Sequence, residues 1–212
     1  MITKIVGKLE SIKDEYIIVG VNGLYYQVLL PSGLVQKLRS SKDIGDEISL
    51  YTLYYIEGGF GMGNQFPRLI GFLNELDREF FEKFITVKGL GEKKALRSLT
   101  MPVKNIAAAI ELGRTKEISS LPGIGPRMAE KIIAELKGKL SVYALMKEGE
   151  PLAVKHEKLL DFKDETLGIL TEQLGYKKKE AQEMIYTALF KNKNIKSTEE
   201  LVKEIYSLKP KF

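Results

Sequence analysis

The spacing of hydrophobic residues changes along the chain and predicts two kinds of structure. In residues 1–72, apolar positions recur in short stretches typical of β-strands. These stretches are 4–12, 15–21, 24–31, 47–56 and 68–72. Asn22-Gly23 lies between the second and third stretches and indicates a hairpin, because both residues tolerate positive φ.

Residues 32–40 have the pattern of a short helix, with Ser32 as the expected N-cap. Three strands, a helix and two strands is the order of a small OB-type barrel. Order alone leaves open any other five-stranded barrel.

From residue 73 the hydrophobic spacing becomes helical. Leu73, Leu76, Phe80, Phe81 and Phe84 recur at helical intervals, so we expect them to face a core. Helical segments then alternate with glycine breaks as far as about residue 140.

A break in the pattern separates a third region from these helices. KEGEP (147–151) is typical of a linker, which we place at 141–158. The tail has three helix candidates, at 162–174, 177–190 and 197–208. We expect Gly175 to end the first candidate, and Ser197 or Thr198 to cap the third.

We therefore predict an α+β multidomain chain. Its parts are an N-terminal OB-fold β-barrel (1–72), a central helical domain (73–140), a flexible linker (141–158) and a C-terminal three-helix bundle (159–212).

One motif occurs twice in the central domain, at an offset of 34 residues. VKGLGEKKALRSL (87–99) and LPGIGPRMAEKII (121–133) share a Gly-apolar-Gly core and an alanine four residues after it. The pattern predicts a helix, a tight glycine hairpin and a second helix. We expect Leu90 and Ile124, between the glycines, to point inward.

The paired glycines predict a phosphate site. Gly89, Gly91, Gly123 and Gly125 can adopt backbone angles closed to other residues, and they let a ligand approach the main chain. Hairpin amides and the positive end of a helix dipole then attract an anion. The expected counter-charges are Lys93, Lys94, Arg127 and Lys131. The alternative is two ordinary glycine caps that bind no ligand.

The surrounding sequence narrows the choice of anion. Neither a dinucleotide-binding fingerprint nor a P-loop is present, because the third glycine and the Gly-Lys-Ser/Thr sequence are missing. Two equivalent cradles suit the two phosphodiester backbones of a duplex, and such contacts position a protein without reading sequence.

Composition agrees with this interpretation but decides little. The net charge is +5, with 7 basic and 7 acidic residues in 1–72, 14 and 11 in 73–150, and 12 and 10 in 151–212. With no cysteine and one histidine, we expect no disulfide, no metal site and no cofactor. We also expect a cytoplasmic protein, since neither a signal peptide nor a membrane span is apparent.

These motifs resemble the helix-hairpin-helix class of DNA-binding modules. The whole layout is similar to the RuvA family of bacterial Holliday junction branch migration subunits. The resemblance is clearest at VNGLYYQVLLP (21–31), LIGF (69–72) and the two hairpins, and weakest beyond residue 140, where LTEQLGYKKKEA (170–181) carries it.

The resemblance implies a non-catalytic homotetramer that holds a four-way junction open, with one or two tetramers per junction. It implies that the hairpins grip phosphates, with help from Lys93, Arg127 and Lys131. It also implies that the third domain binds the RuvB ATPase, that the RuvC resolvase is a further partner, and that the role lies in recombination, DNA repair and the SOS response.

One segment departs from the family pattern. The family carries adjacent acidic residues, an acidic pin, in the turn between the last two barrel strands. The matching segment here is IEGGFGMGNQFPR (56–68), which is longer, rich in glycine and has a single carboxylate, Glu57. Glu57 is the candidate pin, and the alternative is a hairpin tip without a role.

Three other functions stay open at this point. One is a helix-hairpin-helix DNA repair enzyme, although Lys131 and Glu135 do not form a convincing catalytic pair. Another is a general duplex or single-strand binder, with Tyr25, Tyr26, Tyr54 and Tyr55 on the barrel as stacking candidates. The last is an assembly scaffold that does not contact DNA.

Overall fold

The computed structural model describes residues 1–58, 65–145, 162–192, 195 and 197–208. The chain divides into two compact units. One contains Met1–Val103 and Lys116–Lys131, and the other contains Lys104–Thr115 and Ile132–Phe212. The domain boundaries expected from the sequence stay predictions.

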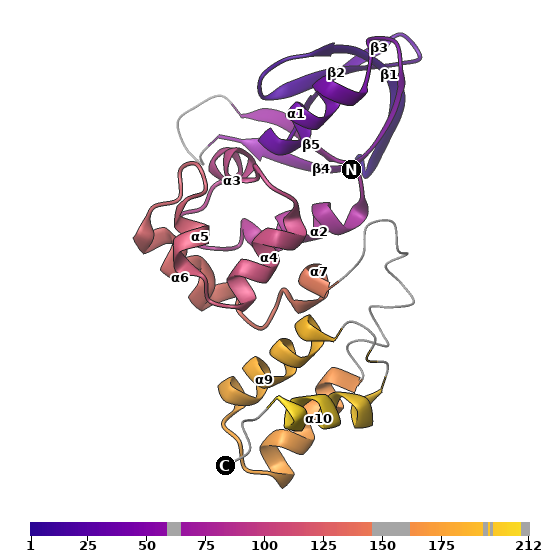
Figure 1. Ribbon diagram of the computed structural model, residues 1–212. Helices are drawn as coiled ribbons and strands as arrows, with labels where there is room; N and C mark the ends of the chain where they lie inside the picture. Colours follow the sequence, from indigo (N-terminus) through magenta and orange to yellow (C-terminus); the bar gives the residue numbers. More distant parts are fainter. Residues whose placement is uncertain (59–64, 146–161, 193–194, 196, 209–212) are drawn as a thin grey trace. The chain divides into compact units, whose positions relative to one another are not determined.

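Five strands close into a barrel in the first unit (Figure 1). They are β1 (Lys4–Ile12), β2 (Tyr16–Val21), β3 (Leu24–Leu29), β4 (Glu47–Glu57) and β5 (Phe66–Phe72). Their order is β1-β2-β3-β5-β4, and β1 also pairs with β4. Only the β3–β5 pair is parallel among these strands. The predicted OB-like barrel is confirmed.

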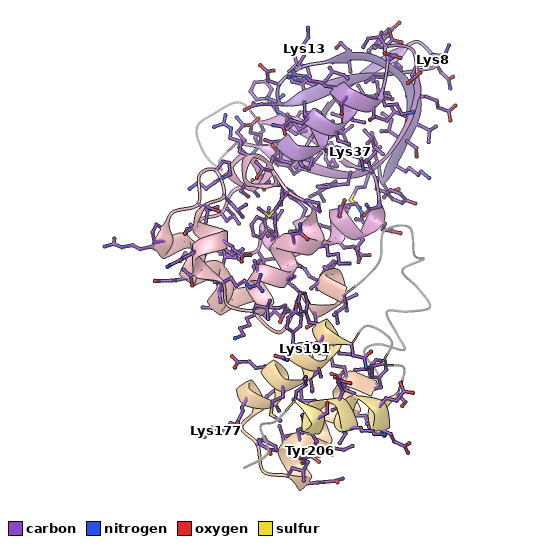
Figure 2. All side chains as sticks on the ribbon, in the orientation of Figure 1. Lys8, Lys13, Lys37, Lys177, Lys191 and Tyr206 are labelled. Atoms are coloured by element: carbon purple, nitrogen blue, oxygen red, sulfur yellow. The ribbon has the colours of Figure 1, made fainter. Side chains whose placement is uncertain are left out.

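Alternation along the strands forms the barrel core. Ile17, Val19 and Val28 are fully buried, while Lys8 and Lys13 lie at the outer surface (Figure 2). The predicted hairpin is also confirmed, since Asn22 (φ 49°) and Gly23 (φ 83°) both have positive φ.

Helix α1 (Ser32–Ser41) follows β3, but its predicted cap is wrong. The N-cap is Pro31, which makes no side-chain capping bond. Pro31 has the extended angles of an N-cap (φ −53°, ψ 139°), so Ser32 is the first residue of the helix, one position before the start expected from a Ser32 cap.

Helix α2 (Glu75–Phe84) confirms most of the aromatic stripe. Phe80, Phe81 and Phe84 are fully buried, and the ring of Phe81 lies 5.2 Å from that of Phe72. Leu73 is an exception, being 36% exposed. It precedes the N-cap Asn74 and so does not share the helix face.

The remaining helices before the tail are short. They are α3 (Glu92–Ser98), α4 (Val103–Glu111), α5 (Thr115–Ser119), α6 (Pro126–Leu136) and α7 (Ser141–Leu145). Helix α7 occupies the first five residues of the predicted linker and buries Val142 and Tyr143. The rest of that linker, 146–158, lies outside the described residues.

The tail contains the expected helices. Residues 162–168 are helical and continue into a π-helical segment, η1 (Ile169–Gln173), which is followed by α9 (Lys178–Lys191) and α10 (Thr198–Ser207). They share a core that includes Leu170, Ile185 and Leu201.

Both predicted end signals in the tail are confirmed. Gly175 has φ 71° just after η1, and the hydroxyl of Ser197 accepts a hydrogen bond from the amide of Glu200 at 3.3 Å. Lys177, the N-cap of α9, and Tyr206, near the end of α10, are both exposed (Figure 2).

Candidate nucleic-acid interface

The two sequence motifs form hairpins with the same hydrogen bonds. The amide of Leu90 donates to the Val87 carbonyl at 2.9 Å, and the amide of Ile124 donates to the Leu121 carbonyl at 3.0 Å. Leu90 and Ile124 are 2% and 3% exposed, so both point inward as predicted. Each hairpin is followed by a helix, α3 after the first and α6 after the second.

The glycines of each hairpin do different work. Gly89 (φ 93°) and Gly123 (φ 77°) need left-handed backbone angles. Gly91 does not, since its φ is −76° and its ψ 163°, and Gly125 is not among the positive-φ residues. The prediction of special angles is therefore wrong for Gly91 and Gly125.

Gly91 and Gly125 instead leave open space in front of the backbone. A Cβ atom added to either would meet nothing within 4 Å. Among the described residues, neither of their amides donates to a protein acceptor. The first-turn amides of α3 and α6 also lack intrahelical partners. Each hairpin thus presents free donors on an unobstructed surface.

The hairpins pack against each other reciprocally. A Cβ on Gly123 would lie 3.3 Å from Cγ of Lys94, and a Cβ on Gly89 would lie 3.4 Å from Cε of Met128. Lys94 and Met128 are equivalent positions of the repeat. Each helix therefore covers the first glycine of the other hairpin, which sets the distance between the two candidate phosphate sites.

Lys131 joins the hairpins instead of projecting freely. Its ammonium donates to the Lys88 carbonyl at 2.6 Å, at the start of the first hairpin. Arg127 remains exposed at the start of α6, and among the described residues it has no acidic partner.

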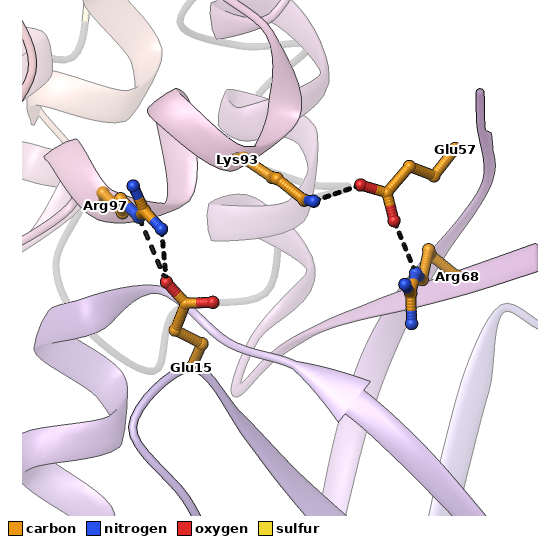
Figure 3. Close-up of polar contacts among 5 residues, drawn as sticks. All are labelled: Glu15, Glu57, Arg68, Lys93 and Arg97. Carbon is orange, nitrogen blue, oxygen red and sulfur yellow. Dashed lines mark hydrogen bonds and ion pairs between the residues drawn. The ribbon is translucent and has the colours of Figure 1, made fainter. Parts of the chain in front are cut away.

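Lys93 and Glu57, both predicted to face DNA, are paired with each other (Figure 3). The second carboxylate oxygen of Glu57 accepts a hydrogen bond from Nε of Arg68 at 2.7 Å. Hydrogen bonds from Lys93 and then Arg68 hold the pKa of the Glu57 carboxyl below its ordinary value. Burial, followed by the charges of Glu57 and Glu92, raises the pKa of Tyr55.

A second ion pair joins α3 to the barrel. Both Nε and Nη2 of Arg97 donate to one oxygen of Glu15, at 3.1 and 2.8 Å (Figure 3). The amide of Gly33 in α1 also donates to the Leu99 carbonyl at 2.9 Å, just after α3. The barrel thereby orients the first hairpin.

Free amides on an open surface are the chemistry that suits an anion such as phosphate, and Arg127 adds an exposed cation at the start of α6. Among the described residues, no three His, Asp or Glu side chains gather as a metal site needs. No helix in that part of the chain is long and apolar enough to cross a membrane.

Known protein families match both the barrel and the pair of hairpins. The RuvA N terminal domain model matches residues 1–58, and the SAM-like Helix-hairpin-helix tandem model matches residues 81–139. The Holliday junction branch migration complex subunit RuvA of Rhodopirellula baltica is 38% identical over 97% of this chain and 98% of its own length. Its namesake from Desulfatibacillum aliphaticivorans is 40% identical over the same shares. This chain belongs to the RuvA family.

Membership of the RuvA family makes the state of Glu57 informative. The candidate pin carboxylate is not a bare charge but is held by two cations. The sequence also offers Phe60 and Met62 of this loop as candidates for contact with bases, but residues 59–64 lie outside the described residues.

Sequence reasoning missed several positions in this RuvA-family chain. Arg68 is the last residue of the segment 56–68, and Arg97 lies one helical turn after Lys93, so both were visible as nearby cations. The 34-residue offset could have paired Lys94 with Met128. Nothing in the sequence indicated which carboxylates pair with Arg68 and Arg97. Nor did it indicate that Lys94 and Met128 lie against glycines of the opposite hairpin.

Proposed function

We propose that this chain is the non-catalytic, junction-binding subunit of a Holliday junction branch migration complex, acting in recombination and DNA repair. The observation that carries the proposal is the pair of equivalent hairpins with open space at Gly91 and Gly125. Relatives that match nearly the whole chain bear the name of such a subunit.

The proposed DNA contacts follow from the geometry of the hairpins. Backbone amides beside Gly91 and Gly125 receive phosphate oxygens, and Arg127 adds charge. Lys94 and Lys131 fix the spacing of the hairpins through their contacts with Gly123 and the Lys88 carbonyl. These contacts recognise backbone shape and not base sequence.

The proposed assembly is a homotetramer, with one or two tetramers per junction, in the cytoplasm. The C-terminal helices recruit a RuvB-type ATPase, and a RuvC-type resolvase acts on the same junction. Support for a separate role of the tail comes from its own hydrophobic core, built on α9 and α10.

A gel-shift competition in EDTA tests the proposal. Labelled four-way junction competes with equal masses of linear duplex and single strand, and we expect the junction to be preferred. Equal binding of linear duplex would contradict junction specificity. A preference for single strand would instead indicate a single-strand binder, with the exposed barrel tyrosines Tyr25 and Tyr54 as the residues that stack on bases.

The variant Gly125→Thr tests the cradle directly. The hydroxyl oxygen of a threonine N-cap accepts hydrogen bonds from the first-turn amides that the phosphate needs, so the fold is preserved while the site is occupied. We expect junction affinity to fall about tenfold or more, as for the loss of charge-assisted hydrogen bonds. The control Gly168→Ala adds a Cβ in equally open space and should bind normally. Undiminished binding by a folded Gly125→Thr would refute the cradle.

A further inference from the structure

The two hairpins have the same backbone but different charges around them. Lys93 and Arg127 are equivalent positions of the repeat. Lys93 is paired with Glu57, and Glu92 lies beside it in the first turn of α3. The first turn of α6 has no acidic residue, and Arg127 is exposed.

On the basis of the proposed function, we infer that the two hairpins bind phosphate differently. The second hairpin binds phosphate without rearrangement, whereas Lys93 at the first hairpin stays paired with Glu57 until a phosphate displaces the carboxylate. Glu57 is then a specificity-determining residue that acts through Lys93. Its carboxylate occupies the same donor that a phosphate oxygen would use.

The pair is built to be displaced. The Lys93 side chain is 65% exposed, and ion pairs with an exposed partner are weak because water and salt screen the charges. A phosphate can therefore compete for its ammonium. The Glu57 side chain is only 25% exposed and keeps its bond to Arg68 when Lys93 leaves.

Arg68 is the positioning residue of this group. Its guanidinium lies 5.8 Å from the ring centroid of Phe66, two residues earlier on the same strand. Residues 57 and 66 are direct partners in the β4–β5 ladder. The Glu57 carboxylate is thus held at the loop end of the β4–β5 strand pair, facing α3 (Figure 3).

Four full-length variants test the inference: Arg127→Gln, Lys93→Gln, Glu57→Gln and the double variant Glu57→Gln with Lys93→Gln. Junction affinity is measured by fluorescence anisotropy in EDTA over a series of KCl concentrations. We expect Arg127→Gln to weaken binding about tenfold. Lys93→Gln should weaken it only about twofold, because Glu57 already occupies the lysine.

The double variant decides the mechanism. Glu57→Gln alone should strengthen binding by up to about fivefold. In that background, removing Lys93 should cost about as much affinity as removing Arg127 does in the wild type. Additive effects would overturn the inference, since Glu57 would then act only as a distant repelling charge. Equal losses from Lys93→Gln and Arg127→Gln in the wild type would overturn it as well.

Asp14→Asn is the matched control. It frees Arg39 of α1 from its ion pair and removes one carboxylate next to the barrel strands, as Glu57→Gln frees Lys93. Affinity should stay within about twofold of wild type. A gain as large as that of Glu57→Gln would mean that any lost carboxylate suffices, against the inference. A wild-type chain that binds no junction would contradict the proposed function itself, whereas normal binding with an additive cycle would contradict this inference alone.

Discussion

Glycine carries two separate tasks at the residue scale. Gly89 and Gly123 allow the chain to turn, because their φ angles of 93° and 77° disfavour any side chain. Gly91 and Gly125 leave room for a ligand, because a side chain at either would begin in space with no other atom within 4 Å. The backbone angles of Gly91 are also ordinary. Stability and the proposed DNA binding are therefore expected to depend on different glycines of the same motif.

Substitution by alanine separates the two tasks. Gly123→Ala should destabilise the fold by about 1–2 kcal/mol, since alanine is strained in the left-handed region. Its Cβ would also press on Lys94 at 3.3 Å. Gly91→Ala should lower the free energy of unfolding less. Urea denaturation followed by circular dichroism measures both, and equal losses would contradict the division of tasks.

Secondary-structure elements are joined by a few buried polar contacts. Glu111, at the end of α4, is only 4% exposed. Its two carboxylate oxygens accept hydrogen bonds from the amides of Gly138 at 2.9 Å and Leu140 at 2.6 Å, just after α6. One side chain thus satisfies two amides of the turn that leads into α7.

Removing that side chain should destabilise the chain strongly. Glu111→Ala leaves two amides unpaired, at about 1–3 kcal/mol each, so we expect a loss of roughly 2–6 kcal/mol in the free energy of unfolding. Glu111→Gln should lose less, because its single amide oxygen still serves one of them. Chemical denaturation measures the losses. Glu130→Ala, on the exposed side of α6, is the control and should change stability by less than about 0.5 kcal/mol. Similar losses for Glu111→Ala and Glu130→Ala would show that the buried carboxylate does not tie the helices.

On the scale of the whole molecule, charge and shape have different roles. The net charge of +5 is modest. Binding therefore depends on where cations meet phosphates, and the barrel and the two hairpins decide this together. Junction recognition further depends on how copies of the chain assemble around DNA, as proposed above.

Salt dependence tests the proposed phosphate contacts. Junction affinity should fall by about 10³–10⁵ between roughly 50 and 200 mM KCl if six to ten phosphates are contacted across the assembly. Fluorescence anisotropy gives the slope. The double variant Gly91→Thr with Gly125→Thr should have a shallower slope, because fewer counterions are released. A flat response of the wild type would be incompatible with phosphate gripping.

Most of the fold could be predicted because it depends on local pattern. Alternation in β2 and β4, the Asn22-Gly23 turn and the aromatic stripe of α2 each depend on residues close in sequence. The predicted ends were less accurate. Pro31, and not Ser32, occupies the N-cap of α1. Helix α7 formed where a linker was expected, because its side chains are buried in a core.

The sequence by itself determined the order of the elements, the 34-residue repeat and the inward direction of Leu90 and Ile124, because periodicity and glycine spacing encode them. Only the tertiary structure decided where the cations of the site go. Lys93 meets Glu57 across 36 residues of chain, and Lys131 meets the Lys88 carbonyl across 43. The partner of a long, flexible side chain depends on which distant segments the fold brings within its reach, and no local pattern specifies that.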